Sequence, residues 1–196
     1  GRWPNVPARK GSDYPEGTFS PTTSVLISGP TEAVLIDAQY LKDDVRDLGD
    51  FIERTGKTLT AIYVTHAHAD HYAGAEVLAA RFPSARYVAL PSVVTAIRDT
   101  IQQSQTNWDL LFADTCVEFS KVPEPLEGTS LYVDGHPIEI IEVGQADIHP
   151  SSIVHVPALD LVVAGDSIYN EIHAMLALST PEEWQEWLRT IDVVEG

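Results

Sequence analysis

Four side chains that can bind a metal ion lie within six consecutive residues, in the segment His66-Ala67-His68-Ala69-Asp70-His71. Three imidazoles and one carboxylate provide the nitrogen and oxygen donors that suit a borderline cation such as zinc. A polar loop that carries histidines by chance would seldom place four such groups so close together. We therefore interpret this segment as a metal site.

The elements on either side of the cluster predict how it is presented. Residues 59–64 form an apolar, β-branched run that is typical of a buried strand, and residues 75–82 are rich in good helix formers. The cluster then occupies a strand-to-helix turn. His66 and His68 project the same way if that turn is extended, because side chains alternate along extended backbone. Asp70 and His71 fall in the first helical turn, from which they can point back toward the same space.

The rest of the sequence predicts strand pairs at both ends of the chain and helices between them. Residues 1–21 read as an N-terminal arm, and residues 22–196 as a single domain. The predicted strands cover residues 23–28, 33–38, 59–64, 86–90, 130–133, 138–143, 152–156 and 159–164, and the predicted helices cover residues 43–52, 75–82, 92–111 and a last stretch that begins at Thr180-Pro181. Asp134-Gly135 predicts a hairpin turn. Two sheets packed between helical layers would accommodate this order.

Composition restricts the classes of function. The 196 residues have a net charge of −17, which disfavours binding to nucleic acid through its phosphates. No run of 18 apolar residues is present, so we expect no membrane partner. The single cysteine, Cys116, excludes an intrachain disulfide and fits a reducing, cytoplasmic compartment. The only methionine is Met175, so we expect the chain to be a piece of a longer protein.

The cluster matches the HxHxDH signature, and with the strand order and a later Ala164-Gly165-Asp166 the sequence resembles the metallo-β-lactamase-fold hydrolases. The resemblance implies an α+β fold, a four-layer αββα sandwich, here lacking its last strand or strands. It implies one or two zinc ions. It also implies a set of metal ligands: His66, His68, Asp70, His71 and Asp166. Asp37 would lie behind these ligands and orient them. The alternative is that Asp37 is a strand-end aspartate that caps a turn.

The third ligand of the first metal departs from the pattern that the resemblance implies. Relatives carry a histidine where this chain has Gln145, and an amide is a poor zinc ligand. Asp147 and His149 lie in the same loop. We predict that His149 is the ligand, with Asp147 as the second choice.

Three further features concern the second metal and the substrate. The final histidine of relatives comes from a strand that would follow residue 196, so we expect the second metal to bind more weakly. Tyr169 and His173 are predicted to line the substrate pocket. Trp184 and Trp187 have helical spacing, which is more typical of a core than of a substrate platform.

The function implied by the resemblance is metal-dependent hydrolysis. A zinc-bound hydroxide would attack the carbonyl of a small lactone, lactam, amide or thioester, with Asp70 as the catalytic residue that orients the nucleophile and passes a proton. The alternative is a metal-binding protein of the same fold with weak or lost catalysis. The expected partner is a small-molecule substrate, and the sequence leaves the oligomeric state open.

Overall fold

Two β-sheets form the centre of the protein. The computed structural model describes residues 2–7, 16–18, 21–176 and 178–195. One sheet has the strand order β3-β4-β5-β6-β7, and the other has the order β11-β10-β9-β8. The five strands of the first sheet are β3 (Val25–Ser28), β4 (Glu32–Ile36), β5 (Thr58–Val64), β6 (Arg86–Ala89) and β7 (Glu124–Pro125). The four strands of the second are β8 (Ser130–Val133), β9 (His136–Gly144), β10 (Ser151–Val156) and β11 (Leu161–Val163).

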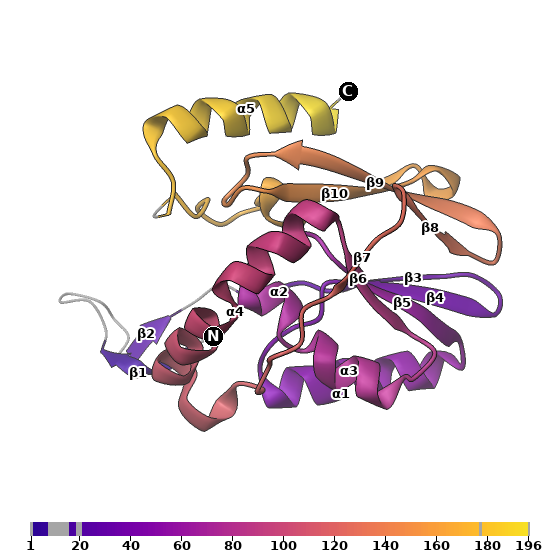
Figure 1. The fold of residues 1–196 in the computed structure, drawn as a ribbon, viewed down its shortest axis with the longest axis horizontal. Helices are drawn as coiled ribbons and strands as arrows, with labels where there is room; N and C mark the ends of the chain where they lie inside the picture. Colours follow the sequence, from indigo (N-terminus) through magenta and orange to yellow (C-terminus); the bar gives the residue numbers. More distant parts are fainter. Residues whose placement is uncertain (1, 8–15, 19–20, 177, 196) are drawn as a thin grey trace.

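Helices cover the outer faces of both sheets (Figure 1). The helices are α1 (Lys42–Thr55), α2 (Ala69–Tyr72), α3 (Ala75–Arg81), α4 (Pro91–Phe112) and α5 (Pro181–Glu195), with short 3-10 turns η1 (Ala113–Thr115), η2 (Pro157–Leu159) and η3 (Gly165–Ser167). In Figure 1, α1 and α3 lie below the five-stranded sheet, α5 lies above the four-stranded sheet, and α4 stands to one side. The predicted four-layer αββα sandwich is therefore confirmed.

The core lies around the central parallel strands of the larger sheet. β4, β5 and β6 run parallel and are almost continuously apolar, as expected for strands covered on both faces. Val34, Ile62 and Val88 are each completely buried. Ile140 and Val154 of the smaller sheet belong to the same cluster of buried side chains, so one core joins both sheets.

Hydrogen bonds also join the two sheets where β5 ends. The Tyr63 hydroxyl lies 2.7 Å from Ser152 Oγ, and the Ser152 backbone N–H donates to the Thr65 carbonyl oxygen. His66 forms an antiparallel β-bridge with Ser151. These contacts bring the beginning of β10, and the loop that precedes it, against the histidine-rich segment that follows β5.

The helix ends follow the sequence signals. α1 has Asp43 and Asp44 in its first turn and ends at Gly56 (φ 66°), a left-handed conformation that glycine adopts without strain. At α5, the Thr180 N–H donates to Glu183 and the Glu183 N–H donates to the Thr180 hydroxyl, which is a capping box at the predicted helix start.

The N-terminal arm is more structured than the sequence predicts. β1 (Arg2–Pro7) and β2 (Glu16–Thr18) pair antiparallel, and β1 lies against α4 (Figure 1). Among the helices that the structure describes, none is both long enough and apolar enough to span a membrane.

Candidate metal centre

The histidine-rich segment crosses from β5 into α2, as the sequence predicts. His68 keeps extended backbone (φ −91°, ψ 137°) immediately before α2 begins at Ala69. The rings of His66 and His68 have centroids 5.0 Å apart, and those of His66 and His71 are 4.1 Å apart. The strand end and the first turn of the short helix thus bring three imidazoles into one space.

Asp37 lies behind these imidazoles and is buried. It follows β4, and its backbone has a positive φ of 58°. Its carboxylate accepts hydrogen bonds from the Thr65 N–H (2.9 Å), from the Thr65 hydroxyl (2.9 Å) and from Nδ1–H of His71 (2.8 Å). One carboxylate therefore fixes both the strand end that carries His66 and the helix that carries His71.

This network assigns the tautomers of two histidines. The Thr65 hydroxyl has one proton, which it gives to Asp37, so it can only accept at its 2.9 Å contact with His66 Nδ1. His66 is then protonated at Nδ1 and has its lone pair at Nε2. His71 donates Nδ1–H to Asp37, so the neutral form that a cation would bind has its lone pair at Nε2. Both lone pairs are available to a cation, which is the usual effect of a carboxylate behind a metal-binding histidine.

The first possible ligand cluster consists of His66, His68 and Asp147. Asp147 lies in the loop between β9 and β10 and is almost completely buried. Its Oδ2 is 2.7 Å from His68 Nδ1 and 3.9 Å from His66 Nε2. The contact between β10 and Thr65 explains how a loop of the smaller sheet reaches the end of β5.

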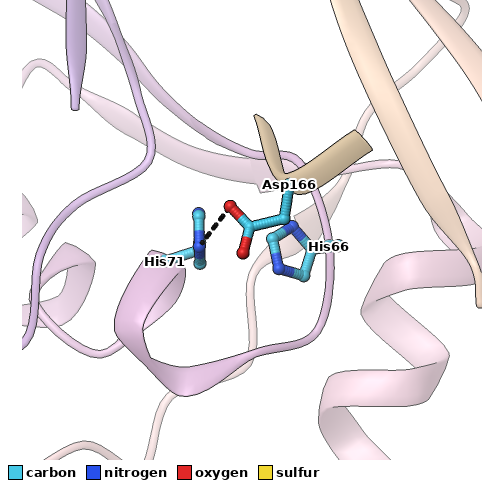
Figure 2. Close-up of side chains that lie close together, drawn as sticks. All are labelled: His66, His71 and Asp166. Atoms are coloured by element: carbon cyan, nitrogen blue, oxygen red, sulfur yellow. Dashed lines mark ion pairs between the residues drawn. The ribbon is translucent and has the colours of Figure 1, made fainter. Parts of the chain in front are cut away.

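The second possible cluster consists of His66, His71 and Asp166 (Figure 2). Asp166 comes from η3, after β11, and faces His71 of α2, with 3.3 Å between Asp166 Oδ1 and His71 Nε2. Its other oxygen accepts a hydrogen bond from the Tyr169 hydroxyl at 2.8 Å. Gly165 must lie close to Thr65 for this approach, because a Cβ at Gly165 would stand 3.0 Å from Thr65 Oγ1.

Asp70 lies at the more open side of the second cluster. Its Oδ2 is 3.7 Å from His71 Nε2 and accepts a hydrogen bond from the Thr22 hydroxyl at 3.0 Å. Its side chain is 28 % exposed, whereas that of His71 is 3 % exposed. Asp70 can therefore meet both a bound ion and a solvent molecule.

The buried carboxylates and imidazoles shift each other's pKa values. Burial, with the neighbouring imidazoles, puts the pKa of His66 well below its ordinary value. Burial also works to lower the pKa of His71, but the carboxylates of Asp37, Asp70 and Asp166 outweigh it and hold that pKa well above the ordinary value. The facing His71 in turn keeps the pKa of Asp166 below its ordinary range despite burial.

His68 Nδ1 lies 2.7 Å from Asp147 Oδ2, which is hydrogen-bond distance. Burial works to lower the pKa of His68, but the hydrogen bond with Asp147 outweighs it and raises that pKa. Burial raises the pKa of Asp147 although His68 opposes the effect. A cation bound by His68 and Asp147 would displace a proton held between them.

The unpaired atoms at this site fit a bound cation. Among the described residues, His66 Nε2, His68 Nε2 and Asp147 Oδ1 are buried and have no hydrogen-bond partner. Buried polar atoms are normally paired, so three orphans in one cluster need an explanation. Two imidazoles and a carboxylate form the donor set of many catalytic zinc sites, which leaves a position open for water or substrate.

The two clusters compete for one histidine. Both include His66, but its Nδ1 is bound to Thr65, so Nε2 alone can coordinate. An imidazole nitrogen has a single lone pair and binds one ion. An ion held by His66, His68 and Asp147 would therefore leave His71 and Asp166, with Asp70 nearby, to a second ion.

The predicted loop ligand His149 lies apart from these groups. It is exposed, and among the described residues the two clusters do not include it. The loop turns at Gly144 (φ 83°) and buries Gln145 and Asp147. The candidate ligand that lies inside is therefore Asp147, the second choice of the sequence prediction. Gln145 directs its amide to the Ala146 carbonyl oxygen rather than to the clusters.

The other site residues differ in how the structure places them. Tyr169 contacts Asp166, whereas His173 is exposed and lies outside both clusters. Trp187 is buried, as its spacing predicts, but Trp184 is partly exposed. Sequence reasoning missed Thr65 and Thr22, which act only through hydrogen bonds to Asp37 and Asp70. Thr65 directly precedes the predicted ligand His66, which was an available signal, whereas Thr22 lies far from the predicted ligands in the sequence.

Comparisons with solved structures support the fold. DIM-1 metallo-beta-lactamase is 18 % identical and superposes with a TM-score of 0.66, covering 88 % of this chain and 72 % of its own. A metallo-beta-lactamase from Pontibacter korlensis is 17 % identical with a TM-score of 0.68, covering 91 % and 75 %. A metallo-beta-lactamase family protein from Thermus thermophilus is 18 % identical with a TM-score of 0.65, covering 96 % and 67 %.

Comparisons with known sequences and with protein families give two results. No curated protein sequence matches this chain. The family described as the Metallo-beta-lactamase superfamily matches residues 17–195, which is nearly the whole chain and includes every residue of both clusters. The match, the shared fold and the two histidine–aspartate clusters lead to one conclusion: this chain belongs to the metallo-β-lactamase superfamily.

Proposed function

We propose that the protein is a metal-dependent hydrolase that cleaves the acyl bond of a small lactone, lactam, amide or thioester. The observation that carries this proposal is the set of three buried, unpaired atoms on His66, His68 and Asp147 beside the second cluster. The proposed ligands are these three residues for one ion, and His71 and Asp166 for another, with Asp70 beside them. Superfamily membership supports the reaction class but not the substrate.

A zinc ion held there would polarise an acyl carbonyl and lower the pKa of a coordinated water toward about 7. The chain's own groups would do the rest. Asp70 is a partly exposed carboxylate beside the second cluster, and the Thr22 hydroxyl fixes one of its oxygens. Among the described residues no side chain donates a hydrogen bond to its other oxygen, which could accept a proton from the attacking water and deliver it to the leaving group. Asp37 holds His66 and His71 in the tautomers that such a centre needs.

A metal-binding protein without turnover is the second candidate. It is favoured by the competition for His66, which leaves the second ion with fewer donors among the described residues. Both candidates predict metal binding, and only the hydrolase predicts catalysis.

The test combines metal content with turnover. Protein refolded or expressed with zinc should contain at least one equivalent by elemental analysis and should hydrolyse at least one member of a panel of lactones, lactams and thioesters. Asp70→Asn should lower kcat by roughly 100-fold to 10,000-fold, the usual contribution of a positioned acid–base group. Asp99→Asn, an exposed aspartate on α4, is the matched control and should leave kcat unchanged. Zinc-loaded protein that turns over nothing on the panel would favour the second candidate.

A further inference from the structure

A groove lies between α5 and the segment that leads into it. Its volume is about 440 Å³, within the range of roughly 300–1,000 Å³ that is typical of small-molecule sites. Ile168, Ile172, Trp184 and Leu188 are among the side chains that line it. Of the described residues that line the groove, none is charged, in a protein that has 29 aspartates and glutamates.

Residues that line the groove contact or directly follow Asp166 of the candidate metal centre. Tyr169 lines it and at the same time donates its hydroxyl to Asp166 at 2.8 Å. Ser167, the residue after Asp166, also lines the groove, and its carbonyl oxygen accepts a hydrogen bond from Trp187 Nε1–H at 2.9 Å. The Trp187 ring is 6.0 Å from the Tyr169 ring. Tyr169 thus both binds the aspartate of the second cluster and lines the groove, next to Ser167 and Trp187.

The apolar side chains of the groove are open to an incoming ligand. Ile172 is 46 % exposed and Leu188 is 54 % exposed, while Trp187 is buried at the base. An apolar surface gains free energy when an apolar group displaces its water, and it gains nothing from a charged group, which would lose its hydration there. The lining therefore selects a neutral, apolar ligand of small size.

We propose that this groove holds the hydrocarbon chain of the acyl group whose carbonyl lies at the metal centre. This inference rests on the proposed function and narrows its substrate class to lactones or thioesters of apolar carboxylic acids. Water adds across the acyl bond. A thioester or an activated ester gives one carboxylic acid and one thiol or alcohol, and a lactone opens to one hydroxy acid. The acyl chain runs from the carbonyl past Tyr169 and along Trp187 toward Leu188.

The proposal predicts a dependence on chain length. Each methylene that enters the groove should tighten binding about fourfold, which is the effect of burying one CH₂ group. The effect should stop when the chain outgrows the groove. A site that recognised only the carbonyl would show no such dependence.

The first experiment measures binding without catalysis. 1-Alkanols from butanol to octanol are titrated against the metal-free protein, with tryptophan fluorescence as the readout because Trp184 and Trp187 line the groove. The wild type should bind with an affinity that rises about fourfold per methylene. Leu188→Glu places a charge in the groove and should remove most of that rise. Val193→Glu is the matched control, since Val193 is 52 % exposed on the same helix but does not line the groove.

The second experiment measures kcat/KM of the zinc-loaded protein for p-nitrophenyl esters with acyl chains of two to eight carbons. The wild type and Val193→Glu should show the same rise with chain length, which Leu188→Glu should lack, and the acetate ester should react equally in the wild type and in Val193→Glu. Turnover that is independent of chain length would overturn the inference and leave the proposed function standing. Alkanol binding without turnover of any ester would contradict the proposed function, and the acyl-chain assignment would fall with it. A dimer that Leu188→Glu dissociates would show a second copy in the groove and would also overturn the inference.

Discussion

Asp37→Asn tests how the histidines of the site are held in position, because it replaces one carboxylate oxygen by an NH₂ group and keeps the shape of the side chain. The carboxylate has an acceptor on each side: Oδ1 receives the Thr65 N–H and Oδ2 receives His71 Nδ1–H. An amide has only one acceptor oxygen. If that oxygen stays on Thr65, the NH₂ group faces His71 and forces its proton onto Nε2, which is the nitrogen that faces Asp166.

The opposite orientation of the amide is no better. The NH₂ group would then face the buried N–H of Thr65, and a buried donor without an acceptor costs about 1–3 kcal/mol. Either way, the group behind a metal-binding histidine is lost, and such changes typically weaken metal affinity about 10–100-fold, or about 1.4–2.7 kcal/mol. We expect a loss of this size for Asp37→Asn.

Competition with a chromophoric zinc chelator at pH 7.5 measures the effect directly. The matched control is Asp134→Asn, at a turn remote from the site, where the carboxylate also accepts backbone N–H groups, from Thr31 and Glu32. That variant should unfold more easily but bind zinc with unchanged affinity. If Asp37→Asn binds zinc as tightly as the wild type, the assignment of the His71 tautomer by Asp37 is refuted.

Three further predictions concern ligands, protons and the thiol. Asp147→Ala should weaken zinc binding more than Asp37→Asn does, because it removes a proposed ligand, whereas His149→Ala should change zinc affinity by no more than about twofold. Equal losses in chelator competition would contradict the placement of the loop. Because the pKa of His71 is raised, a metal ion must displace its proton at neutral pH, so zinc affinity should rise with pH. Calorimetry in buffers of different ionisation enthalpy should detect the released proton. Zinc affinity that is flat between pH 6 and pH 8 would count against a protonated His71. Burial raises the pKa of the Cys116 thiol to about 12, so Cys116 should resist an aqueous thiol reagent at pH 8 until the protein is denatured, and rapid labelling of native protein would show that the thiol is accessible.

Local patterns in the sequence predict most of this fold. Each hairpin and each long helix is signalled by its own residues, such as Asp134-Gly135 between β8 and β9 and Thr180-Pro181 before α5. The motif of the metal site is equally local, because one strand end and one helical turn place His66, His68 and His71 together. Such features need no information from distant parts of the chain.

The choice between Asp147 and His149 does not follow from local pattern. Both residues lie in one short loop, and histidine is as good a ligand as aspartate. The loop is placed by contacts that the sequence does not reveal: the bridge between His66 and Ser151, and the hydrogen bond from Thr190 of α5 to the Gln145 carbonyl oxygen. Tertiary contacts, rather than the chemistry of the ligand, decide which side chain of the loop is buried.

α5 influences the metal centre although it provides none of the proposed ligands. Thr190 binds the carbonyl oxygens of Val143 and Gln145, which precede Asp147, and Trp187 binds the carbonyl oxygen of Ser167, which follows Asp166. One helix thus positions both carboxylates of the smaller sheet, while the larger sheet provides the histidines. An ion bound between the two groups would tie the sheets together, and a ligand at about 100 times its Kd stabilises the folded state by about 2.7 kcal/mol. We therefore expect docking of α5 and metal binding to be coupled, because each requires the two sheets to keep the same relative position.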